Sequence, residues 1–335
     1  MTSGPTPAET GQASPGRAGM ILAIVSAATF GTSGTFATSL IHAGWSPGAA
    51  VLARIAAAAL ILTGPAVMAL RGRWGQLRRG FPRVAGYGLF AVAGAQLCYF
   101  NAIQRIPIGV ALLLEYLGVI LVVGWMWLRH AQRPRRLTIA GAVMALAGLG
   151  LVLDLSGSAR LSPIGVMWGL GAAVGLAVYF VLSASADGDA LPPIAMAWAG
   201  MCTGAALLGA LGLARVLPMR ATASDVQFLH HQVSWIVPVV GLALVAAVIP
   251  YVTGIGAARR LGARLSSFVG MAEILFAVLF AWLLLGQLPT VLQFVGGALI
   301  LAGVALVRLA ELRQPAAPEP GHETDAGLAD ALARS

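Results

Sequence analysis

The chain has 335 residues, of which 59% are hydrophobic and only 10% are charged, and its mean hydropathy is +0.86. Soluble domains carry about 25% charged residues, so this composition excludes an ordinary soluble protein and favours a protein of the lipid bilayer. The formal net charge is +9, and all 21 basic residues are arginine. Because the arginines gather in short segments between apolar runs, we expect no nucleic-acid partner.

The two ends of the chain differ from the apolar region between them. Residues 1–18 are rich in Pro, Gly, Ser and Thr, which predicts a disordered cytoplasmic segment, and residues 314–335 are predicted to form a flexible tail. Ten windows between these ends approach the roughly 20 apolar residues that a spanning helix needs. They are 20–41, 48–70, 84–103, 107–128, 137–155, 163–183, 191–214, 235–257, 265–285 and 291–309. We therefore predict an all-α integral membrane protein of about ten transmembrane helices.

The arginines of the loops predict an orientation. Cytoplasmic loops of membrane proteins carry an excess of Lys and Arg. The segments 71–83, 129–136 and 258–264 hold most of the loop arginines, and the alternate loops hold few. Those few are Arg105, Arg160, Arg215 and Arg220. We predict a multi-pass protein of the cell inner membrane with both termini in the cytoplasm.

The order of features repeats within the chain. Tyr99 and Tyr251 each stand in a short polar segment, which is followed by arginine and then by an apolar run with a single glutamate, Glu115 or Glu273. A glycine-rich helix closes each copy. The two halves predicted from this order are 19–155 and 161–309. Each half holds five helices, an odd number, so the halves are expected to lie in opposite orientations, as inverted repeats of secondary transporters do.

Three charged residues lie inside the apolar windows. They are Arg54, Glu115 and Glu273. A charge in a spanning segment costs about 2.5–3.5 kcal/mol on insertion scales, so each one needs a reason. Glu115 is a candidate contact for a substrate amine or a carrier of a proton, and Arg54 is a candidate contact for a carboxylate. The alternative is that Arg54 and Glu115 form a structural ion pair, and that Glu273 makes a polar contact between helices.

Polar side chains in two further windows complete the candidate site. Gln96 and Tyr99 are three residues apart, on one face of a helix, and Asn101 follows them. Pro250 precedes Tyr251, and a proline frees a backbone carbonyl that can line a cavity. Hydrogen bonding between helices is the alternative role for all of these residues.

The sequence lacks the patterns that mark several kinds of catalytic, nucleotide-binding and metal site. We find no glycine-rich phosphate loop, no HExxH pattern and no catalytic triad pattern, and the five histidines lack the spacing of metal ligands. Cys98 and Cys202 both lie in apolar runs, which does not indicate a disulfide. We expect no cofactor, no metal and no enzymatic activity. A membrane-embedded lipid-modifying enzyme is the alternative, and its acidic pattern would have to come from Asp187 and Asp189.

The run from Ala102 to Tyr116, which reads Ala-Ile-Gln-Arg-Ile-Pro and continues to a lone glutamate, resembles the EamA family of the drug/metabolite transporter superfamily. Within that family it is most similar to the threonine/homoserine exporter branch. The second copy, from Ile249 to Gln287, is similar to the same branch, and the resemblance covers most of residues 20–309. Three positions depart from the branch, which usually has proline at the positions of Val119 and Ile274 and glutamate at that of Gln287.

The resemblance implies ten helices in two inverted five-helix halves. It implies the export of amino acids or related metabolites, with proton antiport as the driving reaction. The expected partners are a small-molecule substrate, the lipid bilayer and a coupling proton, and a homodimer is left open. The alternative function is transport of a drug, a nucleoside or another metabolite by the same fold.

Overall fold

The computed structural model describes residues 15–130, 136–152, 161–184, 191–228 and 231–312. The predicted tail 314–335, most of the predicted N-terminal segment, and the Asp187 and Asp189 pair lie outside these residues. The first helix begins at Pro15, so residues 15–18 are helical and do not belong to a disordered segment as the sequence suggested.

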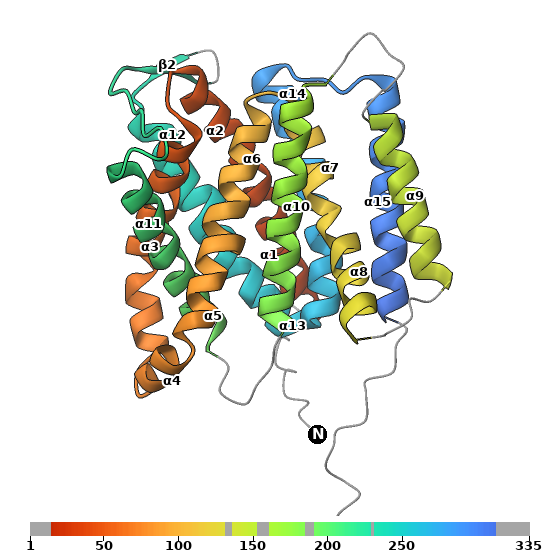
Figure 1. Ribbon diagram of the computed structural model, residues 1–335, viewed down its shortest axis with the longest axis horizontal. Helices are drawn as coiled ribbons and strands as arrows, with labels where there is room; N and C mark the ends of the chain where they lie inside the picture. The colour runs from red at the N-terminus through yellow and green to blue at the C-terminus, as the bar shows by residue number, and fades with distance from the viewer. Residues whose placement is uncertain (1–14, 131–135, 153–160, 185–190, 229–230, 313–335) are drawn as a thin grey trace, which may run out of the picture.

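The described chain consists almost entirely of helices (Figure 1). The first half contains α1 (Pro15–Gly31), α2 (Ser33–His42), α3 (Pro47–Ala69), α4 (Trp74–Arg79), α5 (Phe81–Gly86), η1 (Tyr87–Gly94), α6 (Ala95–Ile103), α7 (Ile108–Tyr116), α8 (Gly118–His130) and α9 (Arg136–Val152). The second half contains α10 (Pro163–Ala184), α11 (Pro193–Leu213), β1 (Val226–Phe228), β2 (His231–Val233), α12 (Ile236–Val240), η2 (Gly241–Val248), α13 (Ile249–Gly270), α14 (Ala272–Leu285) and α15 (Val291–Leu312). The segments η1 and η2 are π-helical.

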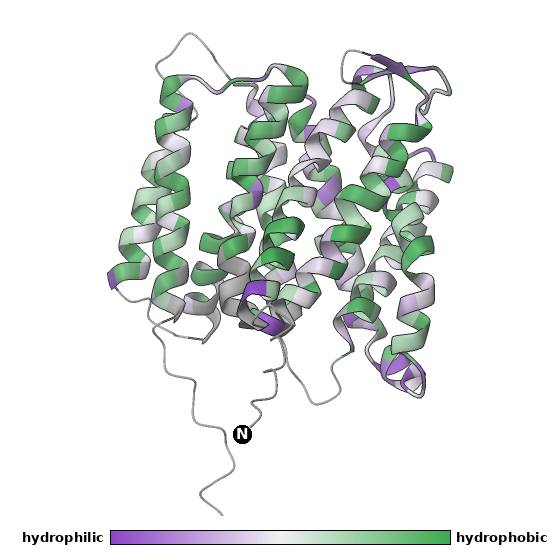
Figure 2. Cartoon of the chain, turned by 180° about the vertical axis from the view of Figure 1, so that it is seen from behind, coloured by the Kyte–Doolittle hydropathy of each residue, from purple (hydrophilic) through white to green (hydrophobic). Residues whose placement is uncertain are grey.

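The helices have the length and surface of membrane-spanning segments. Within the described residues, five are long and apolar enough to cross a membrane: Arg17–His42, Pro47–Ala69, Ile108–Trp125, Ile194–Leu213 and Ile236–Ala257. Shorter apolar helices lie at Arg136–Val152, Pro163–Tyr179, Ala272–Leu285 and Val291–Val307. The outward side chains are apolar too, as Leu60, Met167 and Phe294 are 76%, 71% and 69% exposed. Figure 2 shows hydrophobic helices between hydrophilic segments at the two ends. So much exposed apolar surface belongs in lipid.

Two predicted helices and one predicted loop differ in detail from the structure. The first is interrupted at Thr32, where the hydroxyls of Thr29 and Thr32 donate to carbonyls of their own helix, at 2.7 Å from Val25 O and 2.6 Å from Thr29 O. Such bonds compete with the regular helical pattern. The fourth is interrupted at Leu117. The predicted loop 258–264 lies inside α13, because its Ala, Arg and Leu residues favour a helix.

A small hairpin, absent from the all-α prediction, lies at the end of the bundle opposite α4 (Figure 1). Its strands β1 and β2 are antiparallel, with Val226 opposite Val233. Beneath the hairpin, the loop before α3 is bonded to the loop after α11. Trp45 Nε1 donates to Thr222 O at 3.0 Å, and Ser46 Oγ donates to Pro218 O at 2.6 Å. These bonds join the two halves of the chain at this end.

Helices α9 and α15 run side by side at one edge of the bundle (Figure 1). Their glycines are in direct backbone contact: Gly141 faces Gly303, and Gly148 faces Gly296. Residue numbers rise along one helix as they fall along the other, so the pair is antiparallel. Gly141 and Gly296 lie 155 residues apart (141 to 296), as do Gly148 and Gly303 (148 to 303), so each pair has nearly the same place in the two halves. Each glycine contacts the counterpart of the other glycine on its own helix. This exchange is the pattern of an interface on a two-fold axis.

Two further features recur at a constant distance along the chain. The π-helical segments η1 and η2 lie 154 residues apart (87 to 241), and so do the interruptions at Leu117 and Met271 (117 to 271). The sequence paired Tyr99 with Tyr251 and Glu115 with Glu273. At 154 residues, the counterpart of Glu115 is Val269 and that of Glu273 is Val119. The two glutamates are therefore not equivalent: one precedes its helix break and the other follows it.

Candidate functional site

Arg54 is the centre of a polar cluster inside the bundle. It lies in α3 with only 3% of its surface exposed. Its Nη1 donates to Ser33 Oγ and to Gln96 Oε1, both at 2.6 Å, and its Nη2 donates to Ala246 O at 2.8 Å. The guanidinium also lies over the ring of Phe100, with Cζ 5.9 Å from the ring centre. Three of its five N–H groups thus have acceptors among the described residues, from α2, α6 and η2.

The acceptor in η2 lies four residues before a proline. In an α-helix the carbonyl of Ala246 would accept from the N–H of residue 250, and Pro250 has none. The sequence analysis predicted that Pro250 frees a carbonyl, and the structure shows Arg54 bonded to it. The carbonyl of Pro250 itself accepts from Ser26 Oγ at 2.9 Å, which ties α1 to the same helix. Residues from both halves therefore hold the arginine in place.

Glu273 and Glu115 have different surroundings. Glu273 lies in the first turn of α14, and Tyr116 Oη lies 3.0 Å from its Oε2. Glu115 is half-buried near the end of α7, and no hydrogen bond or ion pair joins it to any other described residue. Both carboxylates are close enough to Arg54 to act on its charge. The structural ion pair between Arg54 and Glu115, considered above, is not formed: neutral acceptors hold the arginine instead.

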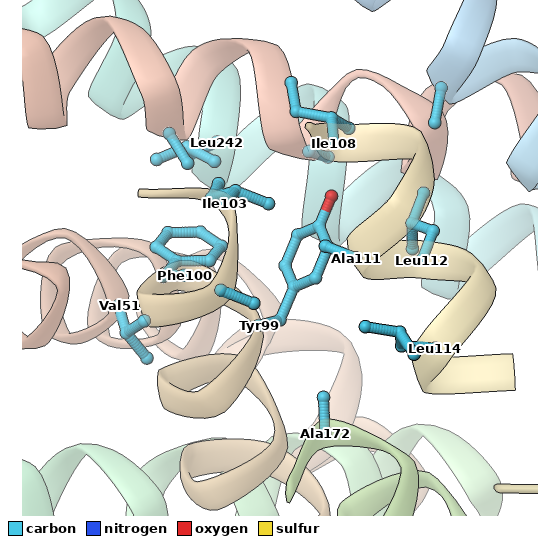
Figure 3. Close-up of a cluster of buried hydrophobic side chains, with 14 of the residues drawn as sticks. Val51, Tyr99, Phe100, Ile103, Ile108, Ala111, Leu112, Leu114, Ala172 and Leu242 are labelled. Atoms are coloured by element: carbon cyan, nitrogen blue, oxygen red, sulfur yellow. The ribbon is translucent and has the colours of Figure 1, made fainter. Parts of the chain in front are cut away.

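The remaining predicted site residues divide into two groups. Gln96 binds Arg54 directly, and the ring of Tyr99 is buried between α6 and α7 beside Ala111 (Figure 3). Tyr251 packs edge-on against Phe30, with ring centres 5.5 Å apart. Asn101 stands apart, because its amide nitrogen donates to Leu97 O of its own helix at 2.8 Å.

The sequence analysis missed two members of the cluster. Ser33 lies where α2 begins, and its sign in the sequence is a run of small and polar residues, Gly31 to Thr35, in the middle of an apolar window. Tyr116 directly follows Glu115 in the chain, and only the fold shows that it faces the other glutamate. Among the described residues, no group of three or more His, Cys, Asp or Glu side chains could hold a metal ion.

Comparison with known proteins identifies the family. The sequence profile of the EamA-like transporter family matches residues 17–154 and again residues 163–309. The chain belongs to the EamA-like transporter family. The two matches place one copy of the EamA domain in each half, so this is a repeat-based, multi-pass membrane transporter.

Comparisons of whole proteins add the fold. No curated protein sequence matches the chain. A crystal structure titled "Crystal structure of protein" is similar to this EamA-like chain with a TM-score of 0.58 and 22% identity, and the match covers 89% of this chain and 99% of the other. At that level of identity the likeness concerns the fold.

Proposed function

We propose that this EamA-like transporter is a secondary exporter of amino acids or related small metabolites, driven by proton antiport. The observation that carries the proposal is the state of Arg54 and Glu115. A buried guanidinium and a half-buried carboxylate share one polar cluster, yet they are not paired. A zwitterion supplies the missing partners: its carboxylate binds the guanidinium, and its ammonium binds Glu115.

The arrangement of the chain supports a transport cycle. The exchanged contacts of α9 with α15 are those of halves related by a two-fold axis, and antiparallel helices place that axis in the membrane plane. We take the halves as 19–155 and 161–309, in opposite orientations. Helix α1 begins, and α15 ends, at the end of the bundle that carries the arginine-rich α4 (Figure 1). By the positive-inside rule this end faces the cytoplasm of the inner membrane.

The proposal assigns a role to each member of the cluster. Arg54 binds the substrate carboxylate, and Glu115 binds its ammonium group. Gln96 and Ser33 keep the guanidinium oriented through their short hydrogen bonds. Tyr99, Tyr251 and Glu273 complete the surroundings of the substrate. Asn101 has no role in this assignment.

The test is efflux from proteoliposomes that contain the purified chain. The vesicles are loaded with a panel of radiolabelled amino acids, and efflux is driven by a proton gradient. We expect Glu115→Gln to abolish efflux while the protein stays folded. Asp225→Asn makes the same chemical change at an exposed site beside the hairpin and serves as the matched control. Full efflux through the Glu115→Gln variant would refute the assigned role.

A second comparison varies the substrate. A zwitterionic amino acid should compete for transport, whereas its amide, which lacks the carboxylate, and its keto-acid, which lacks the amine, should not. If nucleosides or uncharged drugs compete for transport and amino acids do not, the alternative substrate class is favoured. Family membership already favours a transporter over a membrane-embedded lipid-modifying enzyme.

A further inference from the structure

The hydroxyl of Tyr116 lies between two oxygen atoms at the break that separates α13 from α14. Its Oη is 3.0 Å from Glu273 Oε2 and 3.2 Å from the carbonyl oxygen of Gly270. A phenol has one proton to donate, and a carbonyl oxygen can only accept. If Tyr116 donates to Gly270, then its bond to Glu273 requires a proton on the carboxyl group. Two separate two-centre bonds form together when Glu273 is a neutral acid that donates to Tyr116 Oη, whereas an ionised Glu273 would have to share the single phenol proton with Gly270 O.

The carbonyl of Gly270 depends on this hydroxyl. In a continuous helix it would accept from the N–H of Ile274, four residues on. At the break that N–H donates to Met271 O instead, at 3.2 Å. The last carbonyls of a helix need partners from elsewhere, and an apolar bundle offers no bulk water. Tyr116, which comes from α7 in the other half of the chain, supplies the partner.

We propose that Glu273 is the proton-carrying carboxyl of this transporter and that Tyr116 couples its protonation to the break between α13 and α14. The inference rests on the proton-coupled export proposed above. With Glu273 protonated, the chain of bonds from Glu273 through Tyr116 to Gly270 is complete and the break is closed. On loss of the proton to water, Tyr116 keeps its own proton and turns it to the carboxylate, which is the stronger acceptor. The carbonyl oxygen of Gly270 then has no hydrogen-bond donor, and the backbone opens at the break between α13 and α14.

The groups that face Glu273 agree with this division of roles. Helix α7 brings Tyr116 and Glu115, α3 brings Arg54, α6 brings Tyr99, and α13 brings Tyr251. Helices α1 and α2 also pack against α14, and their titratable residues are Arg17 and His42, near the outer ends of those helices. Among the described residues the Glu273 carboxyl is hydrogen-bonded to Tyr116, and Glu115 is left for the substrate.

The test uses the full chain in lipid nanodiscs without any substrate. Deuterium exchange is followed for the amides of residues 274–278, the start of α14, and each rate is divided by the intrinsic rate at that pH. In the wild type we expect protection at low pH and its loss at high pH by a factor on the order of ten, which is what one buried hydrogen bond contributes. Glu273→Gln, whose amide still donates to Tyr116, should be protected at every pH.

Two tyrosine variants complete the design. Tyr116→Phe removes the hydroxyl and should exchange rapidly at every pH. Tyr87→Phe removes another buried hydroxyl, one in η1, and should behave as the wild type. Infrared spectra provide a measure that does not depend on folding of the Tyr116 variant: the difference between the spectra of the wild type and Glu273→Gln should contain the carbonyl band of one protonated carboxylic acid.

Flat exchange across the pH range in the wild type, or wild-type pH dependence in Tyr116→Phe, would overturn the coupling. Absence of this carbonyl band from the difference between the wild type and Glu273→Gln would overturn the assignment of the proton to Glu273. These results are distinct from failure of the proposed function. A chain that exports no amino acid but shows the pH-dependent exchange loses the proposed function and retains the switch.

Discussion

The contact of α9 with α15 allows one prediction to be worked out in detail. A Cβ atom added to Gly148 would lie 2.5 Å from Gly296 O and 2.8 Å from the backbone nitrogen of Ile300. Both are backbone atoms, which cannot rotate away as a side chain can. Ordinary contact begins near 3.4 Å, so Gly148→Ala must separate the helices by about 1 Å. Overpacking of this kind destabilises a protein by about 1–3 kcal/mol.

The same helix offers a matched control. An added Cβ at Gly150 meets nothing within 4 Å. In Gly150→Ala the higher helix propensity of alanine therefore acts alone, and it should stabilise the chain by about 0.5–1 kcal/mol. The two substitutions are identical in chemistry and two residues apart, yet we expect opposite signs.

The assay is reversible unfolding in mixed micelles as the fraction of denaturing detergent rises. The midpoint should fall for Gly148→Ala and rise for Gly150→Ala. Gly296→Ala should resemble Gly148→Ala, because its added Cβ would lie 2.6 Å from Gly148 O. Equal midpoints for the variants at 148 and 150 would refute the reasoning from backbone contact.

Two further predictions concern single hydrogen bonds. Trp45→Phe removes the donor to Thr222 O at the hairpin end and should lower the free energy of unfolding by about 1 kcal/mol, whereas Trp74→Phe, at a 45% exposed position in α4, should have little effect in the same unfolding assay. Asn101→Ala should leave efflux from proteoliposomes unchanged, because its amide serves Leu97 O of its own helix. Loss of efflux in that variant would return Asn101 to the substrate site.

Much of the fold could be predicted because a segment that spans the bilayer must be long and apolar. Long apolar windows give spanning helices, and each of the ten predicted windows overlaps a helix or a run of helices, although α13 crosses the predicted boundary between the windows 235–257 and 265–285. A hydropathy window averages the polarity of side chains, so it does not detect a change in backbone hydrogen bonding among apolar residues. The interruption at Leu117 and the π-helical segments η1 and η2 lie inside apolar stretches, so they could not be predicted from composition. The interruption at Thr32 lies in the small and polar run from Gly31 to Thr35, which hydropathy averages into its apolar window.

The candidate site was predictable as a set of charges and less so as a set of contacts. Arg54, Glu115 and Glu273 are identified by their cost in an apolar helix. Their partners depend on how helices from the two halves meet. Ser33 and Ala246 reach Arg54 from windows far apart in the sequence, and a backbone carbonyl leaves no mark in a residue pattern. The main error was in the alignment of the two halves. Glu115 and Glu273 were paired as counterparts, but Glu115 precedes the helix break of its half and Glu273 follows the break of the other.

The contact of Tyr116 with Gly270 has a consequence for the energetics of the two halves. These residues are counterparts, 154 residues apart (116 to 270), so the contact lies where a two-fold axis would pass. Two identical halves could exchange their conformations and give two states of equal free energy. Here one half donates a hydroxyl, and glycine has no side chain with which to return the bond. The equality is removed at this position, so two conformations related by such an exchange would differ in free energy even without a bound substrate.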